Sequence, residues 1–462
     1  MSADLVGASS GDRARVAVVG AGMSGPVTAI YLARRFGRVD IVDQRAHPGH
    51  ASGQQDRPRS LTVILSAHGW RVLDELGMAE AVRDVCTPLS GRRAHLPDGT
   101  EVFTAYGRDG QQIWAVKRDE LHRLLVDRAQ ATSGVRLLFG ARVLDVDVDE
   151  PALLVEGTEG ALRMRYEHVI GCDGVHSRVR AALTRRGFDS QVHRLPWGYM
   201  DLDLRPQQAG ARWATDAFHY WPRGGALFGA FPTRDGGFTG SLFLPLRGAE
   251  FCWDAPRDRL PALFARAFPD LAACDDGLAA QLLTRPINPV HTVHSDRWTW
   301  QGTAALVGDA CHAMAPFMGQ GMNCAFEDAR VLDQCLGSGL EWPDALAAYE
   351  RRRRKDVDAI VAISHEHYLT LTRPPEQAEP APAQALRQRL TDLFPERFVP
   401  LYERCAFTHQ GYAEAQRHEQ ALHELTARLL TEHGPALPGA DDDRLRRVTV
   451  DSLAERNTPP TP

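Results

Sequence analysis

Residues 16–45 read VAVVGAGMSGPVTAIYLARRFGRVDIVDQR, the pattern of a strand, a glycine turn, a helix and a second strand. The run VAVVG is continuously apolar, as expected for a parallel strand that is covered on both faces. GPVTAIYLARRF then has helical periodicity, and VDIVDQR forms a second short strand. The stretch therefore predicts a βαβ unit at the start of an α/β domain.

The turn of this unit carries a G-x-G-x-x-G fingerprint at Gly20, Gly22 and Gly25. Gly20 permits the tight turn, Gly22 lets the backbone approach a pyrophosphate, and Gly25 allows the helix to pack closely on the strand. Exposed N–H groups at the helix start would then hold the anion. Asp43 ends the second strand, where an acid accepts hydrogen bonds from ribose hydroxyls. A plain tight turn is the alternative, but strand, helix and acid together favour a nucleotide site.

An Asp-Gly pair, Asp173 and Gly174, follows another apolar strand in the stretch HVIGCDGVHSRVR. Taken alone, Asp-Gly is more often an ordinary turn than a binding motif. Its position after a strand makes it a second candidate contact for a nucleotide.

Residues 306–329, LVGDACHAMAPFMGQGMNCAFEDA, form the third and strongest motif. Asp309 is placed to accept from a ribityl or phosphate-adjacent hydroxyl, and Gly319 and Gly321 let amides at a helix start face a flat ring. That helix N-terminus would stabilise negative charge on a reduced flavin, which favours FAD over NAD(P). We interpret His312 as a hydrogen-bonded loop histidine rather than a catalytic residue.

Composition sets limits on the remaining classes of function. A chain of 462 residues can hold two or three domains, and its net charge of −6 argues against a nucleic-acid partner. Eight cysteines without a C-x-x-C pair predict free thiols and no metal site. The polar N-terminus and the lack of a long apolar stretch predict a cytoplasmic protein without membrane contact.

The pattern along the chain predicts an α/β protein with an inserted sheet domain. Aromatic-rich alternating runs after residue 189 favour an antiparallel sheet, residues 59–87 read as mostly helical, and a helix starts near Lys117. A Pro/Ala linker covers 373–384. The expected units are a discontinuous FAD-binding domain (1–188 and 286–372, with some substrate-domain strands within 75–115), a β-sheet substrate domain (189–285), a C-terminal helical region (385–435) and a disordered tail (436–462).

The three motifs, in this order, resemble the single-component FAD-dependent aromatic hydroxylases, the group A flavoprotein monooxygenases. The resemblance implies a Rossmann-like FAD domain of the GR2 type, as in p-hydroxybenzoate hydroxylase. It also implies that NADPH or NADH docks without a βαβ domain of its own, which agrees with the single fingerprint. In that family the reduced flavin takes up O2, and its C4a-hydroperoxide transfers one oxygen to an electron-rich ring. No side-chain nucleophile is expected.

Longer stretches, among them RPRSLTVILSAHGWRVLDELGM, FHYWPRG and FTGSLFLP, resemble the kynurenine 3-monooxygenase branch of that family from about residue 14 to 425. The resemblance implies aromatic residues around the substrate at Tyr106, Phe238, Phe317 and Tyr412. The FAD contacts that the motifs and the resemblance imply are Gly20, Gly22, Met23, Ser24, Gly25, Asp43, Gln44, Arg45, Arg59, Arg118, Asp173, Gly174, Gly308, Asp309, Pro316, Gly319, Gly321, Met322 and Asn323.

Three departures from that branch concern the substrate. Alignment by eye puts Ser90 where the branch has a carboxylate-binding arginine, His367 where it has an asparagine, and Met318 where it has a histidine. Loss of a charge-assisted bond to a carboxylate costs roughly 1.5–3 kcal/mol. Arg92, Arg93 and His367 are candidates to compensate.

Several functions stay open on this sequence. The substrate is kynurenine or another aryl amine, anthranilate, indole or quinolone, and the oligomeric state is open. A flavoprotein oxidase or reductase and a non-catalytic flavin protein are less favoured, because every cradle motif is complete. A halogenase is disfavoured because RWTWQG, residues 297–302, lacks the Ile-Pro that follows W-x-W in those enzymes.

Overall fold

The computed structural model describes residues 15–50, 61–157, 160–205, 213–275, 277–372 and 379–455. Its first layer is a six-stranded sheet, parallel except at the β18–β19 edge pair. The strand order is β18 (Thr299–Trp300), β19 (Ala304–Leu306), β12 (His168–Gly171), β1 (Val16–Val19), β2 (Val39–Asp43) and β8 (Val135–Phe139). All four residues of β1 are buried, which explains the continuous apolar run VAVV.

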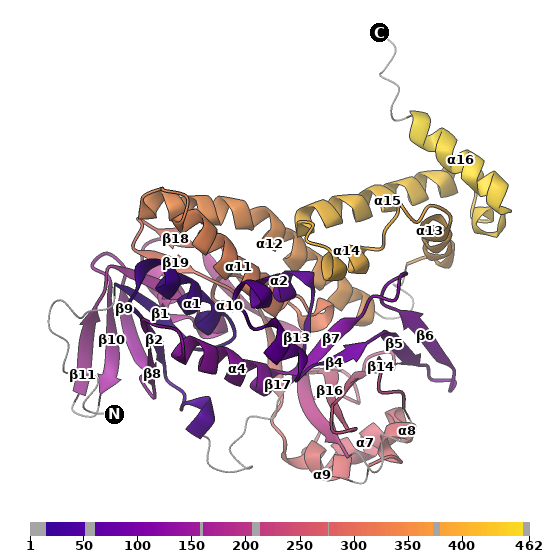
Figure 1. The fold of residues 1–462 in the computed structure, drawn as a ribbon. Coiled ribbons are helices and arrows are strands. Elements are labelled where there is room, and N and C mark those ends of the chain that lie inside the picture. The colour runs from indigo at the N-terminus through magenta and orange to yellow at the C-terminus, as the bar shows by residue number, and fades with distance from the viewer. Residues whose placement is uncertain are drawn as a thin grey trace.

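Helices pack on this sheet and complete the predicted βαβ unit. Helix α1 connects β1 to β2 and packs on α11, so the prediction for residues 16–45 is confirmed. A three-stranded antiparallel sheet, β9 (Val143–Asp147), β10 (Ala152–Gly157) and β11 (Gly160–Arg165), lies beside it (Figure 1). The helices of this region are α1 (Ser24–Phe36), α2 (Ala67–Glu75), α3 (Ala79–Arg83), α4 (Arg118–Gln130), α5 (Arg178–Thr184), α10 (Asp309–His312) and α11 (Gly321–Leu336).

The mostly helical prediction for residues 59–87 is only partly right. Helices α2 and α3 are present, but two short strands flank them, β3 (Thr62–Leu65) and β4 (Thr87–Leu89). Both pair with β7 (Ile113–Lys117) in a small antiparallel sheet. A strand as short as TVIL gives too few residues for a periodicity, so only its distant partner identifies it.

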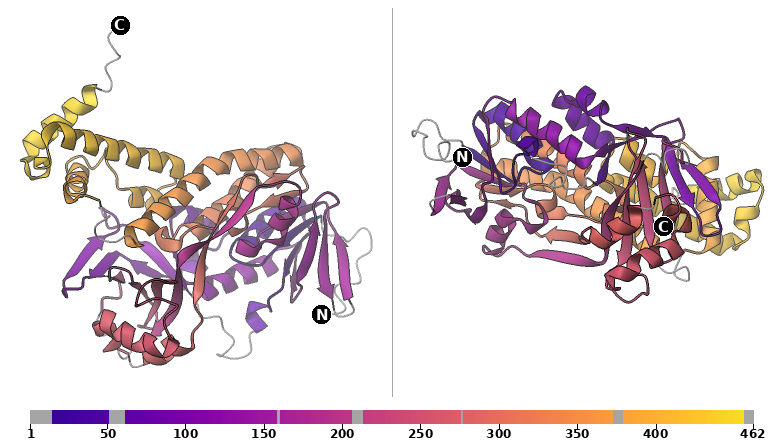
Figure 2. Two further views of the ribbon diagram at one scale, coloured as in Figure 1. Left: turned by 180° about the vertical axis from the view of Figure 1, so that it is seen from behind. Right: turned by 90° about the horizontal axis from the view of Figure 1, so that it is seen from below.

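A seven-stranded sheet forms the second layer. Its order is β17 (Asn288–Ser295), β13 (Ser190–Leu204), β16 (Phe238–Pro245), β15 (Leu227–Pro232), β14 (Ala217–Pro222), β5 (Gly91–His95) and β6 (Glu101–Ala105). The sheet therefore includes strands that precede residue 189 (β5 and β6) and one that follows residue 285 (β17), outside the expected substrate domain of 189–285. Figures 1 and 2 show α7 (Leu260–Ala267), α8 (Pro269–Ala272) and α9 (Gly277–Thr284) gathered at one end of this sheet, away from α11.

The C-terminal part is helical, and its end projects from the body of the molecule (Figures 1 and 2). Its helices are α12 (Trp342–Thr372), α13 (Ala381–Leu393), α14 (Leu401–Phe407), α15 (Tyr412–His433) and α16 (Asp442–Glu455). The prediction of a disordered tail from 436 is wrong for α16, because its Leu445 is fully buried in a leucine cluster with α13 and α15. Residues 373–378 of the linker and 456–462 of the tail lie outside the described residues.

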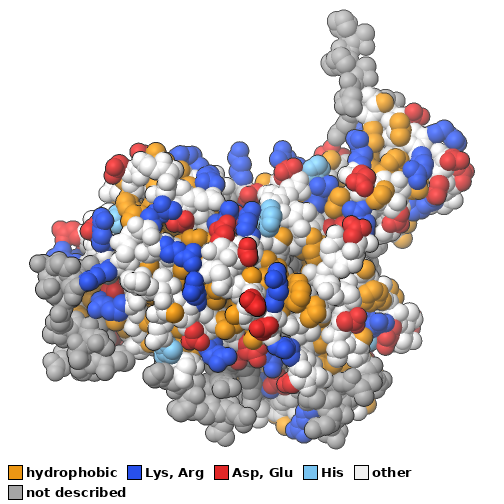
Figure 3. Space-filling view, viewed as in Figure 1, with side chains coloured by type: hydrophobic (Ala, Val, Ile, Leu, Met, Phe, Trp, Pro, Cys, Tyr) orange, Lys and Arg blue, Asp and Glu red, His pale blue; other side chains and the backbone are white. Residues whose placement is uncertain are grey.

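Basic and acidic side chains are interspersed over the face shown in Figure 3, without a continuous basic field among its described residues. Within the described ranges, no helix has both the length and the apolar content needed to cross a bilayer.

Candidate functional site

The three sequence motifs meet at one edge of the six-stranded sheet. Strand β12 lies between β1 and β19, so the turns that follow these three parallel strands emerge side by side. A Cβ atom placed on Gly20 would lie 2.6 Å from the carbonyl oxygen of Cys172, next to the Asp-Gly pair. A Cβ atom placed on Gly308 would lie 3.4 Å from Oγ of Ser24. The edge therefore joins the fingerprint, the Asp-Gly pair and the Gly-Asp turn.

The geometry at this edge fits FAD. Gly20 has φ +97°, and a side chain on Gly25 would lie 1.9 Å from the carbonyl oxygen of Gly20, so both positions require glycine. No atom of the described residues lies within 4 Å of the position a Gly22 side chain would take, which leaves the approach to the helix start open to them. Among the same residues Oδ1 of Asp173 is buried without a hydrogen-bond partner, and the side chain of Asp309 is exposed at the same edge.

Asp43, which the sequence predicts as an acceptor for ribose hydroxyls, is bonded to the glycine turn and to Arg45. Its carboxylate accepts from the N–H groups of Ala21, at 2.7 Å, and Arg45, at 2.8 Å, and pairs with the Arg45 guanidinium at 2.7 Å. Burial alone would raise the pKa of Asp43, but the Arg45 bonds lower it below the ordinary value. His122 of α4 lies here too, with Nε2 2.5 Å from the carbonyl oxygen of Ala21. No motif in the sequence marks His122.

An arginine ties the Asp-Gly pair to the Gly-Asp turn. Nη1 of Arg180 donates to the carbonyl oxygen of Ala310 at 2.7 Å. Asp173 caps the same helix, α5, because its Oδ2 accepts from the N–H of Arg178 at 2.6 Å. The two motifs are therefore fixed relative to each other by the first turn of α5.

The loop between η4 (Pro316–Met318) and α11 forms the other end of the cradle. Gly319 has φ +64°, and the position of a Gly321 side chain is open except for Met314 Cγ at 3.9 Å. Asn323 is fully buried: its Oδ1 accepts from the N–H of Ser66, and its Nδ2 donates to the carbonyl oxygens of Ile64 and Gly319. Only the backbone of Asn323 is left for the cofactor.

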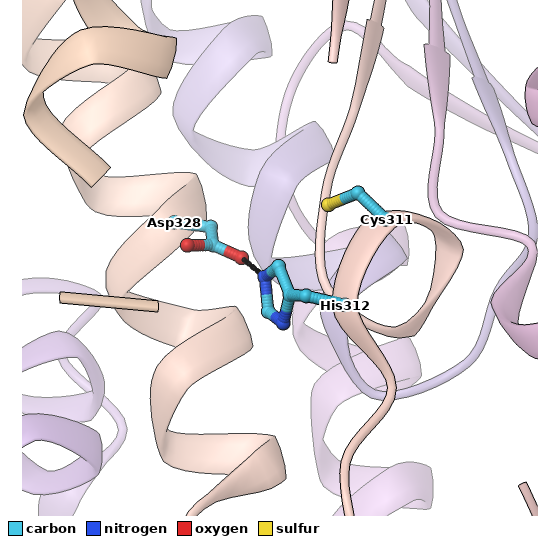
Figure 4. Close-up of side chains that lie close together, drawn as sticks. All are labelled: Cys311, His312 and Asp328. Carbon is cyan, nitrogen blue, oxygen red and sulfur yellow. Dashed lines mark hydrogen bonds and ion pairs between the residues drawn. The ribbon is translucent and has the colours of Figure 1, made fainter. Parts of the chain in front are cut away.

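A buried triad, formed by His312, Asp328 and Arg353, lies directly behind this cradle. Nε2 of His312 lies 2.5 Å from Oδ2 of Asp328, as Figure 4 shows, and Nε of Arg353 donates to Oδ1 at 2.7 Å. Oδ2 also accepts from the N–H of Gly308 at 3.1 Å. Cys311, His312 and Asp328 are close enough to hold a metal ion. The donor set does not fit one, because Arg353 already neutralises Asp328 and burial raises the pKa of the Cys311 thiol.

A second group of residues lies on the seven-stranded sheet, on the face opposite α7–α9. Arg92 of β5 is in register with Phe218 of β14, which places both on this face. Its neighbour Arg93 points to the other face, where it lies 3.6 Å from Glu101 and over the ring of Phe103. Among the described residues Arg92 has no carboxylate partner, and its side chain is half-buried.

Two tyrosines lie beside Arg92. The rings of Tyr106 and Tyr402 stack with centroids 5.3 Å apart, in one cluster with Phe218. Burial raises the pKa of Tyr106 well above its ordinary value, and Arg92 opposes that shift. The charge of Arg92 also acts on His367 of α12. Burial lowers the pKa of His367 to about 4, and the positive charge of Arg92 contributes to this shift. His367 is therefore neutral at pH 7.

The structure separates other residues that the sequence predicted to share this site. Phe238 lies on the opposite face of the sheet, 5.5 Å from Trp213 between ring centroids, because strand alternation turns it toward α7–α9. The hydroxyl of Tyr412 donates to Gln320. The ring stacked on Tyr106 is that of Tyr402, which the sequence analysis did not single out.

The remaining predicted residues are placed as follows. The side chain of Ser90 donates to Asp216. Phe317 packs between Phe243 and Tyr368, and Met318 is buried in the core of the FAD-binding domain. Met23 precedes α1, Gln44 is exposed beyond β2, Arg118 begins α4 and Met322 lies in the first turn of α11. Arg59 lies outside the described residues.

Comparison with known proteins agrees with this geometry. The family described as FAD binding domain matches residues 13–364. A kynurenine 3-monooxygenase of Myxococcus xanthus is 35% identical over 451 residues, covering 96% of this chain and 96% of that protein. The kynurenine 3-monooxygenase of Salinispora arenicola is 36% identical over 411 residues, covering 87% and 90%.

Two solved structures are similar as well. The tetrameric form of 2-methyl-3-hydroxypyridine-5-carboxylic acid oxygenase superposes with a TM-score of 0.64 at 25% identity, covering 77% of this chain and 91% of that one. Pseudomonas aeruginosa PqsL in complex with 2-aminobenzoylacetate gives a TM-score of 0.62 at 25% identity, covering 78% and 97%. The chain belongs to the FAD binding domain family and, within it, to the FAD-dependent aromatic monooxygenases related to kynurenine 3-monooxygenase.

Proposed function

We propose that the chain hydroxylates an aromatic amine that carries a carboxylate, with L-kynurenine as the substrate. FAD and NADPH serve this class of enzyme, and bound FAD supplies the chemistry by activating O2 and delivering one oxygen atom to the ring. The fingerprint turn, Asp43, Asp309 and the Gly319–Gly321 loop would hold that FAD. The position that receives the oxygen is the ring carbon that kynurenine 3-monooxygenases are named for.

The observation that carries this proposal is the Arg92 guanidinium, which has no carboxylate partner among the residues that the structure describes. A half-buried cation without a counter-charge is costly, and a carboxylate from the substrate would supply that charge. Arginine suits this role because its planar fork binds a carboxylate through two parallel hydrogen bonds. The sequence alignment assigned the role to position 90. In the structure Ser90 is bonded to Asp216, and Arg92 is the arginine beside Tyr106 and Tyr402.

Neighbouring side chains would orient the ring of the substrate. The stacked rings of buried Tyr106 and partly buried Tyr402 would shield the guanidinium from water. Neutral His367 offers one ring nitrogen as a donor and the other as an acceptor. An aryl amine or ketone is the kind of polar group that such a residue can bind. The complex of PqsL with 2-aminobenzoylacetate shows a related fold holding a ligand with both groups and a carboxylate.

The test is NADPH consumption by the purified flavoprotein with and without L-kynurenine, with products followed by mass spectrometry. Stimulated NADPH oxidation and a product heavier by one oxygen atom are the expected results. Slow, unstimulated oxidation that releases hydrogen peroxide would contradict kynurenine as the substrate. The same NADPH assay with 2-aminobenzoylacetate and with anthranilate would then identify which aryl amine stimulates the enzyme.

A pair of adjacent arginines gives a matched control for the binding site. Arg92→Ala should raise the KM for L-kynurenine roughly ten- to a hundredfold, since a charge-assisted bond is worth about 1.5–3 kcal/mol. Arg93→Ala removes the same charge from the next residue on the opposite face, and should leave KM within about twofold of the wild-type value. Equal effects of both substitutions would mean that Arg92 acts only through net charge.

A further inference from the structure

The loop that would face the flavin ring is held from behind by the C-terminal helix α15. Tyr412 is the first residue of that helix and only 1% exposed. Its ring lies 4.8 Å from the ring of His68 on α2, and its hydroxyl donates to Oε1 of Gln320 at 3.1 Å. The contact joins a helix near the end of the chain to the middle of the third cofactor motif.

Gln320 is the residue through which such a contact can act on the cofactor. It lies between Gly319 and Gly321, and its own side chain is 1% exposed. Its carbonyl oxygen accepts from the N–H of Cys324 at 2.8 Å, which is the first hydrogen bond of α11. The N–H groups of the first helical turn have no partner within the helix and are the donors available to an anionic ring edge. Movement of Gln320 would therefore displace those donors.

The start of α15 is also tied to the opposite end of the cradle. The N–H of Ala413 donates to Oδ1 of Asp356 at 3.0 Å, and Oδ2 of Asp356 lies 4.0 Å from Nη1 of Arg353. Arg353 donates to Asp328, which in turn accepts from the N–H of Gly308 at 3.1 Å. The position of Tyr412 is thus set by the same buried charges that hold the Gly308 turn.

We propose that Tyr412 is a positioning residue for the flavin, because its hydroxyl orients Gln320 and thereby fixes the backbone donors of the Gly319–Gly321 loop. It does not contact the substrate in this role, and the proposal holds whatever the substrate is. Removal of the hydroxyl leaves Oε1 of Gln320 buried without a donor, an arrangement that proteins avoid. The loop would relax to satisfy that oxygen, and its amides would bind the reduced, anionic flavin less well.

The experiment compares Tyr412→Phe with wild type in the full-length holoenzyme. The readout is the midpoint potential of the bound flavin, measured by reductive titration against a reference dye. We expect about tenfold weaker binding of reduced relative to oxidised flavin, which corresponds to a potential about 30 mV more negative for a two-electron couple. The affinity for oxidised FAD, measured by flavin fluorescence, should stay within about twofold, since the fingerprint turn is untouched.

Tyr349→Phe is the matched control. Tyr349 is also fully buried, and its hydroxyl donates to the carbonyl oxygen of Leu306 at 2.9 Å, on strand β19 rather than on the loop. This variant loses a comparable buried hydrogen bond and should lose thermal stability without a change in potential. Equal potentials for Tyr412→Phe, Tyr349→Phe and wild type would overturn the proposal.

A double substitution tests whether the effect passes through Gln320. Gln320→Leu removes the acceptor, so Tyr412→Phe should cause no further change in potential in that background. Additive shifts would show that Tyr412 acts by another route and would also overturn the proposal. If Tyr412→Phe gives no folded protein, Gln320→Leu alone must shift the potential in the same direction, and an unchanged potential there refutes the mechanism.

Discussion

Asp328→Asn is the substitution that most directly tests how the cofactor cradle is supported. Asp328 is completely buried, and its two oxygens receive His312 at 2.5 Å, Arg353 at 2.7 Å and the N–H of Gly308 at 3.1 Å. An asparagine keeps the shape but has one acceptor oxygen instead of two, and its NH₂ group faces a donor. Arg353, itself only 3% exposed, would lose its nearest counter-charge.

The expected loss of unfolding free energy follows from the burial of Asp328. Removal of one partner from a buried ion pair costs about 3–5 kcal/mol. Burial alone would raise the pKa of Asp328, yet His312 and Arg353 lower it to about 2 from 3.8. That shift corresponds to roughly 2–3 kcal/mol of stability. The contribution is complete above pH 3.8 and disappears as the pH falls through 2, so the carboxylate stabilises the fold at neutral pH.

The assay is urea unfolding of the holoprotein at a fixed excess of FAD, followed by flavin fluorescence and far-UV circular dichroism. Asp328→Asn should lower the free energy of unfolding by about 3–5 kcal/mol and release FAD at a lower urea concentration. Asp333→Asn is the control, because Asp333 lies on the same helix and pairs with the partly exposed Arg35 at 2.8 Å. That variant should lose less than about 1 kcal/mol. Similar losses in the two variants would refute the argument from burial.

Three further predictions test separate parts of the molecule. Gly25→Ala places a methyl group 1.9 Å from the carbonyl oxygen of Gly20, so the purified protein should be nearly colourless at 450 nm. Phe238→Ala should cost about 3–5 kcal/mol of unfolding free energy and leave the substrate KM unchanged, since the ring lies in the core beneath α7–α9. A raised substrate KM would instead show that Phe238 contributes to substrate binding. Burial raises the pKa of Asp201 to about 6 from 3.8, so this acid binds a proton in the folded state between these values and stability falls as the pH rises through them. Asp201→Asn should abolish that fall, about 2–3 kcal/mol, and an unchanged pH profile of urea unfolding would contradict it.

The cofactor motifs could be identified in the sequence because each depends on local spacing. Gly20, Gly22 and Gly25 serve one turn. The steric need for glycine at position 25 arises within that turn, and the need at position 20 arises from Cys172 and Asp173 just beyond the adjacent strand. The buried strands on either side are short apolar runs, which a single parallel sheet between helices requires. Spacing along the chain was therefore enough to predict the βαβ unit and a nucleotide site that favours FAD, whereas the class of reaction came from the resemblance to the aromatic hydroxylases.

The candidate substrate-binding residues could not be predicted from spacing along the chain. Arg92 and Arg93 are neighbours in sequence, and only the pairing of β5 with β14, far along the chain, decides which of them shares a face with Tyr106. The sequence analysis named Tyr412 and not Tyr402, whereas the packing of α14 and α15 places Tyr402 against Tyr106 and Tyr412 against Gln320.

The sequence alone determined the nucleotide-binding turns, since those depend on residues a few positions apart whose backbone geometry is local. Tertiary structure alone decided, within the described residues, that Arg92 rather than Arg93 is left without a carboxylate partner, that Tyr402 stacks on Tyr106, and that Asp328 supports the cradle from behind. These properties come from strand register and helix packing between distant segments, and no local pattern records them.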